Sequence, residues 1–573
     1  MSNLCIDFGS TFIKYFIHDG EKVVFSDKLR FPAPCVCEGD AYEIPVQSID
    51  AAVRKIFSDT EGYRVWNCFL AVQMHGYVLQ KTDGTFSNYI SWKDRRGDLS
   101  APLLQKIDFE QNGTSLKRNL PAVKLCSLEQ ECTFFTLGSY IAYYLTGKNI
   151  THKTDACASG LFDAQTLEPV WLPRVIALPE VTHRILPVGS YQGIRIYTPV
   201  GDHQVSFLGS GAGNDAYLLN IGTATQISTL ALRYEKDARF EKRPFFTDAR
   251  LVTVSGLPGG ELLYDGYSPE EFSKAVLSAL TKLPAKNKVL VGGGGADLVF
   301  EKLRVFLKDY GIECVKLESN ISKEGLIEIM KMCKTQIGVM LSEVCFPNFP
   351  IILKNERMGF LIVDNEHGSF DYSFLSAAVM NARLVDLPLI VRLPDNNRRD
   401  ITKLADMGVA GFLLPMTNSA ADIQKVVDYA KYAPVGKRGI STNRAHTLYN
   451  PPPMEEYIPM ANKRVKVYAQ IETKAGVDNI EEILSVNGVD GIFVGPNDLS
   501  CDMGCIGDQA PVMAAIRAVS AAAHRHNKPW GIITTSKELI ACSRECGVDF
   551  ICYGSEINML KNACKTIRGL FWE

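Results

Sequence analysis

Apolar and polar residues alternate in a regular pattern from residue 336 to the end of the sequence. Eight short apolar runs predict buried strands: QIGVMLS, MGFLIVD, LPLIVRL, VAGFLLPM, VKVYAQIE, VDGIFVG, PWGIIT and VDFICYG. Segments with helical periodicity, such as DITKLADMG and PVMAAIRAVSAAAHRH, fall between or after them. Several helical segments end in glycine just before the next strand, as is common at helix C-termini. Strand–helix units in this number and at this spacing predict a (β/α)8 barrel.

Charged and imidazole side chains stand where these predicted strands end. They are Asp364, His367, Arg392, Glu472 and Asp498. A single acidic residue at a strand end is usually a helix cap or a solvated charge. In a parallel barrel, however, the C-terminal ends of all strands meet on one face, where active sites lie. Five such residues on one face therefore favour a catalytic site.

The residue types suggest how this site would work. Glu472 and Asp498 are the candidate metal ligands, because hard divalent cations prefer carboxylate oxygens and fill their remaining positions with water. A 2-oxo acid would chelate that metal, which would stabilise an enolate as a Lewis acid. Arg392 is the candidate for holding the keto oxygen or the carboxylate. His367, oriented by Asp364 three residues earlier, is the candidate for proton transfer.

Ordered motifs over residues 336–573 resemble the HpcH/HpaI family of metal-dependent pyruvate aldolases. They are VDNEHGSFD, IVRLP, GFLLPMTNSAAD, APVGKRGIS, QIETKAGVDNIEEIL and VDGIFVGPNDLSCDMG. The resemblance implies a Mg²⁺- or Mn²⁺-dependent class II cleavage of a 4-hydroxy-2-oxo acid to pyruvate and an aldehyde. It also implies that backbone amides of the GPxDL loop bind the carboxylate, here those of Gly495 and Asn497, since Pro496 has no amide hydrogen.

The first half of the sequence contains three glycine-rich turns between apolar runs. LCIDFGSTFIKYFI and LLNIGTATQIS each read as strand, Gly/Thr turn and strand, and KVLVGGGGADLVF reads as strand, four glycines and helix. A single DFGST turn is often an ordinary hairpin. Two such turns followed by a glycine-rich loop, where a ligand can approach the backbone closely, predict an actin-like (ribonuclease H-like) fold with two lobes.

The segments between these turns resemble the FGGY carbohydrate kinases, especially those similar to sedoheptulokinase and xylulokinase. They include AVQMHGYVL, SWKDRRG and PVGDHQVSFLGSG. The resemblance implies that Asp202 is the general base and that MgATP is the cosubstrate. The sugar would bind Gln73, His75 and Asp94. The expected nucleotide-binding residues are Asp7, Gly9, Thr11, Gly222, Thr223, Gly293, Gly294 and Gly295.

We therefore expect three domains: a sugar-binding kinase lobe at 1–196, an abbreviated nucleotide-binding lobe at 197–330, and an aldolase barrel at 331–573. The predicted function is bifunctional, namely phosphorylation of a ketose-type sugar and retro-aldol cleavage of a 2-oxo acid. Because the second lobe is short, the alternative is an aldolase with the kinase-like module as a regulatory or scaffold domain. A scaffold without enzymatic activity is disfavoured because both candidate sites retain their charged residues.

Composition limits the partners and the compartment. The sequence has 573 residues, of which 46% are hydrophobic, and 61 Lys+Arg against 64 Asp+Glu leave a net charge of −3. This balance gives no electrostatic case for nucleic acid or an anionic membrane. The start of the sequence does not resemble a signal peptide, and its 16 cysteines form no CxxC pair. We expect a cytoplasmic enzyme of carbohydrate metabolism that acts on small molecules, with homo-oligomers assembled through the barrel.

Overall fold

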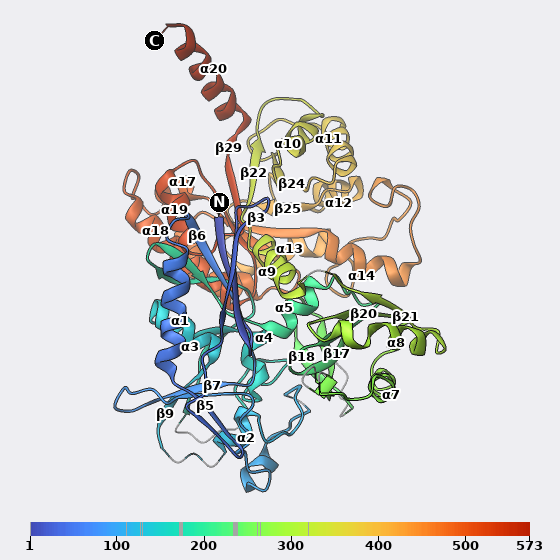
Figure 1. Ribbon diagram of the computed structural model, residues 1–573. Helices are drawn as coiled ribbons and strands as arrows, with labels where there is room; N and C mark the ends of the chain where they lie inside the picture. The colour runs from blue at the N-terminus through green and yellow to red at the C-terminus, as the bar shows by residue number, and fades with distance from the viewer. Residues whose placement is uncertain are drawn as a thin grey trace. The chain divides into compact units, whose positions relative to one another are not determined.

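The computed structural model describes residues 2–572, apart from residues 111, 127, 129, 171–175, 233–238, 260–261, 264 and 319. The chain folds into two compact units, which divide between Cys333 and Lys334 (Figure 1). The first unit contains four β-sheets flanked by helices, and the second contains a closed barrel. The mixed α/β fold class predicted from the apolar pattern is confirmed.

The largest sheet of the first unit has the strand order β13-β14-β6-β1-β2-β3, and β15 also pairs with β6. Its strands are β1 (Ser2–Phe8), β2 (Phe12–His18), β3 (Val23–Arg30), β6 (Val65–Val72), β13 (Pro187–Tyr191), β14 (Ile194–Tyr197) and β15 (Val200–Gly201). The helices α1 (Val46–Asp59) and α3 (Leu137–Thr146) share an apolar core with this sheet. The antiparallel β1–β2 pair leaves the Gly9–Thr11 turn at its end.

Two smaller sheets extend the first unit. One has the order β11-β9-β7-β8-β5-β4, and the other pairs β10 with β12. Their strands are β4 (Val36–Glu38), β5 (Ala41–Ile44), β7 (Tyr77–Lys81), β8 (Tyr89–Ile90), β9 (Cys132–Thr136), β10 (Ile150–His152), β11 (Ile176–Ala177) and β12 (Glu180–Thr182). The short helices α2 (Pro121–Leu125) and α4 (Lys153–Ala156) lie in the same part of the chain.

The fourth sheet of the first unit has the order β18-β19-β17-β16-β20-β21. Its strands are β16 (Tyr217–Ile221), β17 (Thr225–Ala231), β18 (Glu241–Pro244), β19 (Arg250–Leu257), β20 (Lys288–Gly292) and β21 (Glu313–Lys316). The helices in this region are α5 (Asp202–Gly209), α7 (Pro269–Leu280), α8 (Ala296–Lys308) and α9 (Ile321–Met332). The β16–β17 hairpin repeats the geometry of β1–β2, so the two predicted phosphate-type turns are both hairpin turns.

Two glycines allow α5 and α9 to pack in very close contact. A Cβ on Gly209 would lie 1.9 Å from the Ile321 carbonyl oxygen, and one on Gly325 would lie 1.9 Å from the Val205 carbonyl oxygen. No side chain fits at either position, so the two backbones approach each other directly. This contact fixes α5, which begins at Asp202, against the helix that ends the first unit.

The second unit is a closed barrel of eight parallel strands in chain order. They are β22 (Gln336–Leu341), β23 (Phe360–Asp364), β24 (Leu389–Arg392), β25 (Gly411–Leu414), β26 (Lys466–Ile471), β27 (Gly491–Val494), β28 (Trp530–Ile533) and β29 (Phe550–Ser555). Each coincides with one of the eight apolar runs. Inside the barrel, Phe360, Tyr468 and Phe493 contribute to an apolar cluster, so the interior is filled.

Helices alternate with the barrel strands. They are α10 (Phe349–Asn355), α11 (Tyr372–Leu384), α12 (Arg398–Met407), α13 (Ala420–Ala430), α14 (Met454–Arg464), α15 (Lys474–Asp478), α16 (Ile480–Ser485), α17 (Pro496–Asp502), α18 (Gln509–Arg525), α19 (Lys537–Glu545) and α20 (Glu556–Trp572). Local sequence explains several helix ends. Gly408 ends α12 with φ 96°, and Ser419 begins α13 with a capping box to Asp422.

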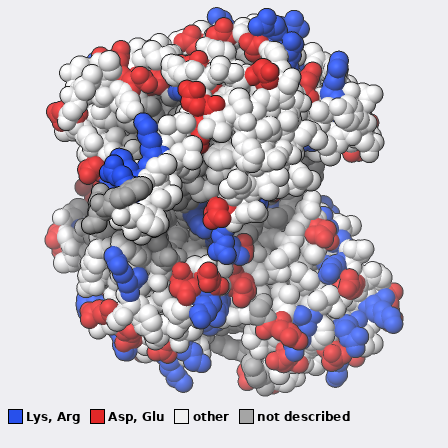
Figure 2. Space-filling model, turned by 90° about the horizontal axis from the view of Figure 1, so that it is seen from above, with Lys and Arg blue, Asp and Glu red and all other residues white. Residues whose placement is uncertain are grey.

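The last helix differs from the others in exposure. Along α20, Leu560, Ile567, Leu570 and Phe571 are 54–75% exposed, and the helix extends away from the barrel strands in Figure 1. Elsewhere the surface is mixed: on the face shown in Figure 2, acidic and basic side chains are interspersed. Within the described residues, no helix has both the length and the apolar character that a bilayer crossing requires.

Candidate active sites

An ion-paired arginine lies at the mouth of the barrel. Arg392, at the end of β24, donates from Nε to Asp364 Oδ1 at 2.9 Å and from Nη2 to Asp364 Oδ2 at 2.7 Å. Its Nη1 lies 3.0 Å from Glu366 Oε2. Burial alone would raise the pKa of Asp364, but the hydrogen bonds and charge of Arg392 lower it. The pair is therefore ionised and fixes the guanidinium at the ends of β23 and β24.

Glu472 follows β26 and is 2% exposed. Its Oε1 accepts from the Met416 amide at 2.6 Å, and its Oε2 accepts from Gln470 Nε2 at 2.6 Å. Burial raises the pKa of Glu472 to about 7. The hydrogen bond from Met416 lowers this pKa, and the charges of Asp498 and Glu366 raise it further. A carboxylate held this far from water beside other acids is poised to accept a positive charge.

Gly495 lies against this carboxylate. A Cβ at Gly495 would be 2.5 Å from Glu472 Oε2, so only glycine fits here without displacing the side chain. The Gly495 amide donates to the Ile471 carbonyl at 3.0 Å, so it is already hydrogen-bonded within the barrel and is not available to a ligand. Asn497, by contrast, is the second residue of α17, where the amides of a helix have no intrahelical acceptor. Of the two predicted amide donors, Asn497 is thus the better placed to contact a ligand.

Asp498 is exposed in the first turn of α17, and its charge acts on both Glu472 and Glu366. Among the described residues, no group of three or more His, Cys, Asp and Glu side chains is arranged to hold a metal ion. The two residues predicted as metal ligands, Glu472 and Asp498, both carry carboxylate oxygens. That donor set suits Mg²⁺ or Mn²⁺, which accept water and substrate oxygens in their remaining positions.

The structure does not bring the Asp364 carboxylate to the His367 ring. Asp364 Oδ1 instead accepts from the backbone amides of Glu366 at 3.1 Å and His367 at 3.3 Å. The His367 side chain is 75% exposed, and its Nε2 lies 3.8 Å from Glu366 Oε2. Glu366 was missed from the sequence, although it stands between the two selected residues in DNEHG. It links the imidazole to Arg392, and its pKa is raised by burial despite that arginine.

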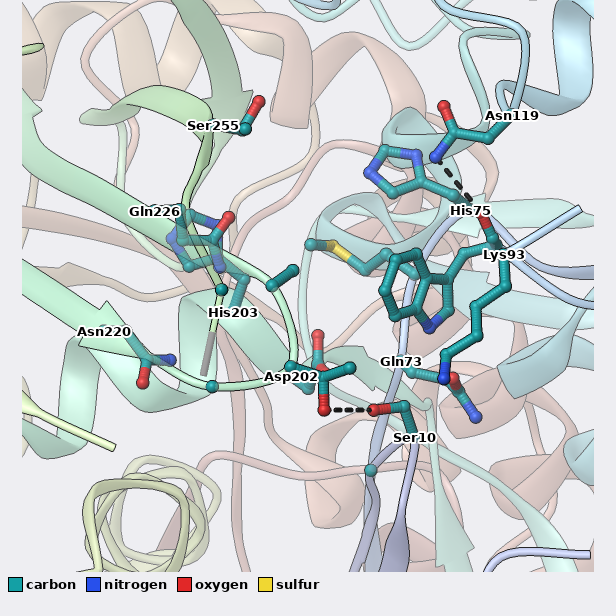
Figure 3. A pocket seen from close by; sticks show the side chains of 18 of the residues that line it. Ser10, Gln73, His75, Lys93, Asn119, Asp202, His203, Asn220, Gln226 and Ser255 are labelled. Carbon is teal, nitrogen blue, oxygen red and sulfur yellow. Dashed lines mark hydrogen bonds between the residues drawn. The ribbon is translucent and has the colours of Figure 1, made fainter. Parts of the chain in front are cut away.

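The first unit contains a cavity of about 1100 Å³. It is lined by eight of the residues selected from the sequence, namely Asp7, Gly9, Thr11, Gln73, His75, Asp202, Gly222 and Thr223. The Ser10 hydroxyl donates to Thr223 Oγ1 at 3.4 Å, so the two hairpin turns meet across it. Figure 3 shows side chains from both parts of the unit around this space, among them Ser10, Gln73 and Asp202.

Asp202 is the first residue of α5, at the end of a helix where backbone amides are free. Burial raises its pKa to about 8, the charge of Asp7 adds to this effect, and the His203 amide opposes it. Burial also raises the pKa of Asp7, against the charge of Lys14. His75 has φ 67°, and burial together with Arg243 lowers its pKa to about 3. The imidazole is therefore neutral and has one donor and one acceptor nitrogen for a ligand.

Asp94 and the glycine run are not part of the cavity lining. Asp94 is fully buried and accepts from Arg96 Nε at 2.8 Å and from the Tyr42 amide at 3.0 Å, with Lys124 Nζ at 3.3 Å. Gly293 has φ 94°, and a Cβ there would lie 2.4 Å from the Ile221 carbonyl oxygen. The Gly295 amide donates to the same oxygen at 3.0 Å, so the run packs against the end of β16.

A charged cluster on the cavity wall was not identified from the sequence. Glu241 and Arg243 are both buried on β18, where Arg243 donates from Nε to Glu241 Oε2 at 3.0 Å. Lys117 pairs with the other oxygen of Glu241, and Arg243 Nη1 lies 2.8 Å from His203 Nδ1. Lys117 lies 124 positions before Glu241 and His203 lies 40 positions before Arg243, so no local spacing indicates these two contacts.

Comparison with known proteins distinguishes the two units. The N-terminal unit has the fold of a xylulose kinase from Lactobacillus acidophilus, whose solved structure matches with a TM-score of 0.51 at 16% identity, covering 58% of this chain and 89% of the kinase. At this identity the match shows the fold alone.

The barrel is similar to a 5-keto-4-deoxy-D-glucarate aldolase from Klebsiella pneumoniae, with 32% identity over 213 residues that cover 37% of this chain and 82% of the relative. A relative of the same name from Citrobacter koseri is 31% identical over 240 residues, covering 42% and 92% of the two chains. The family model of the HpcH/HpaI aldolase/citrate lyases matches residues 356–563. Through its barrel, the chain belongs to the HpcH/HpaI aldolase/citrate lyase family.

Proposed function

We propose that the barrel cleaves a 4-hydroxy-2-oxo acid to pyruvate and an aldehyde in a metal-dependent retro-aldol reaction. The observation that carries this proposal is the buried carboxylate of Glu472, which is held by two hydrogen bonds beside Asp498 and Arg392. Glu472 and Asp498 would hold Mg²⁺ or Mn²⁺, and a bound cation of this kind supplies Lewis-acid stabilisation of an enolate. The relatives named 5-keto-4-deoxy-D-glucarate aldolase favour an acyclic sugar acid as the substrate.

Arg392 would bind the substrate while anchored to the barrel. A guanidinium has five N–H groups, and its three contacts to Asp364 and Glu366 leave donors available for the keto oxygen or the carboxylate. In the cleavage, the C4 hydroxyl loses its proton, the C3–C4 bond breaks, and C3 gains a proton to give pyruvate. His367 and the neighbouring Glu366 would move these protons, since both lie at the mouth and Glu366 reaches both Arg392 and the imidazole.

The test is pyruvate release from a panel of 4-hydroxy-2-oxo acids by the full chain. We expect release to stop with EDTA and to return with Mg²⁺ or Mn²⁺. Glu472→Gln should reduce release at least about a thousandfold, because an amide replaces a charged ligand. Asp202→Asn is the matched control and should retain full cleavage. Cleavage that continues in EDTA, or in the Glu472→Gln variant, would contradict the proposal.

We further propose that the N-terminal unit transfers the γ-phosphoryl group of MgATP to a hydroxyl of a ketose-type sugar. Its support is the cavity where Asp202 faces the turns that contain Gly9, Thr11, Gly222 and Thr223. Asp202 would take the hydroxyl proton as the new P–O bond forms, and the bridging P–O bond breaks to release ADP. Asp7 would act at the Mg²⁺–phosphate end, and the Gly293–Gly295 run would lie beside the adenine.

Sugar-dependent ADP release separates this proposal from the alternative, in which the first unit is a regulatory or scaffold module. Asp202→Asn should abolish sugar phosphorylation, and Glu472→Gln should leave it unchanged. If no sugar tested, neutral or anionic, increases ADP release, the aldolase-only alternative is favoured.

The remaining proposals concern organisation. We propose kinase lobes at 1–196 and 197–330 followed by the aldolase barrel, a cytoplasmic location, and homo-oligomers that form through the barrel. The exposed apolar side chains of α20 support self-association, because surfaces of this kind are usually covered in an assembly. Sedimentation equilibrium of the full chain tests this, and a monomer at micromolar concentration would refute it.

A further inference from the structure

The cationic side chains around the N-terminal cavity are only partly neutralised. The residues before position 120 place five cations in its lining, namely Lys14, Lys93, Arg95, Lys117 and Arg118. Lys117 pairs with Glu241, and Arg118 Nη2 lies 2.8 Å from Asp40 Oδ2. Lys14 lies near Asp7, whose pKa it lowers. In the described part of the chain, none of Lys14, Lys93 and Arg95 has a carboxylate within ion-pair distance, and Lys93 and Arg95 also lack the nearby Asp7 that Lys14 has.

Lys93 is positioned to contact a ligand. It is half-buried, and its Nζ lies 5.5 Å from the centre of the Tyr42 ring and 5.8 Å from the centre of the Trp92 ring. In Figure 3 the Lys93 side chain extends toward Gln73 and Ser10, and Lys93 lines the same cavity as Asp202. Aromatic rings restrain an ammonium group but accept no hydrogen bond of full strength, so its donors remain available.

Two buried polar groups that line the same cavity have no hydrogen-bond partner among the residues that the structure describes. Gln73 is 4% exposed, and its Nε2 has no hydrogen-bond acceptor. Thr114 is 7% exposed, and its hydroxyl is also without a partner. Both residues line the cavity. Buried polar groups are normally paired, so an unpaired amide donor at a cavity wall indicates a place where a ligand supplies the acceptor.

We propose that the sugar phosphorylated in this cavity carries an anionic group, a carboxylate or a phosphate, on its polyhydroxy chain. Lys93 binds that group, with Gln73 Nε2 as a second donor and Arg95 at the rim. The remaining hydroxyls contact His75 and Thr114, and one of them faces Asp202. This assignment rests on the proposed kinase function and narrows its substrate from neutral ketoses to acidic sugars. A substrate with a carboxylate would share that group with the 2-oxo acid proposed for the barrel.

The test compares matched sugars that differ only in charge. The full chain is assayed for ADP release with gluconate against glucitol, with glucitol 6-phosphate against glucitol, and with neutral ketoses. We expect kcat/KM to be at least about tenfold higher for the carboxylate or phosphate member of a pair, because hydrogen bonds to charged groups are the stronger ones. Comparing gluconate with glucitol 6-phosphate shows whether the site accepts a carboxylate or a phosphate.

Variants of Lys93 assign the effect to this residue. Lys93→Met should raise KM for the anionic sugar about tenfold to hundredfold, with KM for ATP and the rate of aldol cleavage unchanged. Lys93→Arg keeps the positive charge and should leave KM for the anionic sugar close to the wild-type value. Lys81→Met removes an exposed lysine from β7 and should change none of these kinetic constants. Equal use of charged and neutral sugars, or a rise in KM for ATP instead of the sugar, would overturn the proposal.

Calorimetric titration separates failure of this proposal from failure of the kinase function. If no sugar increases ADP release, the proposed kinase function is wrong. Binding of the acidic sugar that is lost in Lys93→Met would still support the anion site. An absence of binding by both acidic sugars would overturn it.

Discussion

Asp202→Asn should stabilise the N-terminal unit progressively more as pH rises, although it removes the proposed catalytic base. The pKa of Asp202 is raised from 3.8 to about 8 by burial and by Asp7. Between these pH values the folded chain binds a proton that the unfolded chain releases, so the unfolding free energy of the wild type falls as pH rises. The stability that protonated Asp202 contributes is fully lost above about pH 8. The slope approaches about 1.4 kcal/mol per pH unit. Asparagine does not titrate, so between pH 5 and pH 7 the variant should gain about 3 kcal/mol relative to wild type.

Hydrogen exchange in urea, followed by mass spectrometry of peptides from β1 and β16, reports unfolding of this unit separately from the barrel. Comparing the two proteins at each pH removes the contribution of every shared group that does not interact with Asp202. Asp7 does interact with it, so the measured difference reports the titration of the Asp7–Asp202 pair. Asp40→Asn is the control, because Asp40 is paired with Arg118 at the exposed rim and its change should stay within about 0.5 kcal/mol. A difference between Asp202→Asn and wild type that is constant from pH 5 to pH 7 would refute the reasoning.

Three further predictions concern the barrel. Asp364→Asn leaves the buried Arg392 without its bidentate carboxylate and should lower the unfolding free energy of the barrel by about 3 kcal/mol, measured by the same exchange experiment on β23 and β24. Gly495→Ala places a methyl group 2.5 Å from Glu472 Oε2, and the displaced carboxylate should lower pyruvate release about a hundredfold with ADP release intact. Ser419→Ala removes the capping box of α13 and should cost about 1 kcal/mol in urea unfolding, with unchanged kcat.

The barrel was predictable from the sequence because its strands are buried on both faces. Such strands appear as continuous apolar runs, and the order of the runs is the order of strands in the barrel. The residue at each strand end follows directly, which is why Arg392 and Glu472 were placed correctly at the mouth. The glycine-rich turns of the first unit were also readable, since a hairpin turn is a local structure.

Side-chain partners were not predictable in the same way. The spacing of Asp364 and His367 suggested one contact, but a bidentate arginine 28 positions away competes better for the carboxylate than an exposed imidazole does. Glu241 pairs with Arg243 two residues along β18, and also with Lys117 from a loop more than a hundred residues earlier. Such contacts depend on tertiary packing, which no spacing along the sequence encodes.

The two sites share an electrostatic arrangement that explains why each needs a ligand to function. Asp202 lies beside Asp7, and Glu472 lies beside Asp498 and Glu366, so each site holds one buried carboxylate near others. The chain supplies some positive charge, yet the pKa of both buried groups stays raised, because burial outweighs it. We infer that a cation bound beside either carboxylate would lower its pKa, because a nearby opposite charge favours the ionised form.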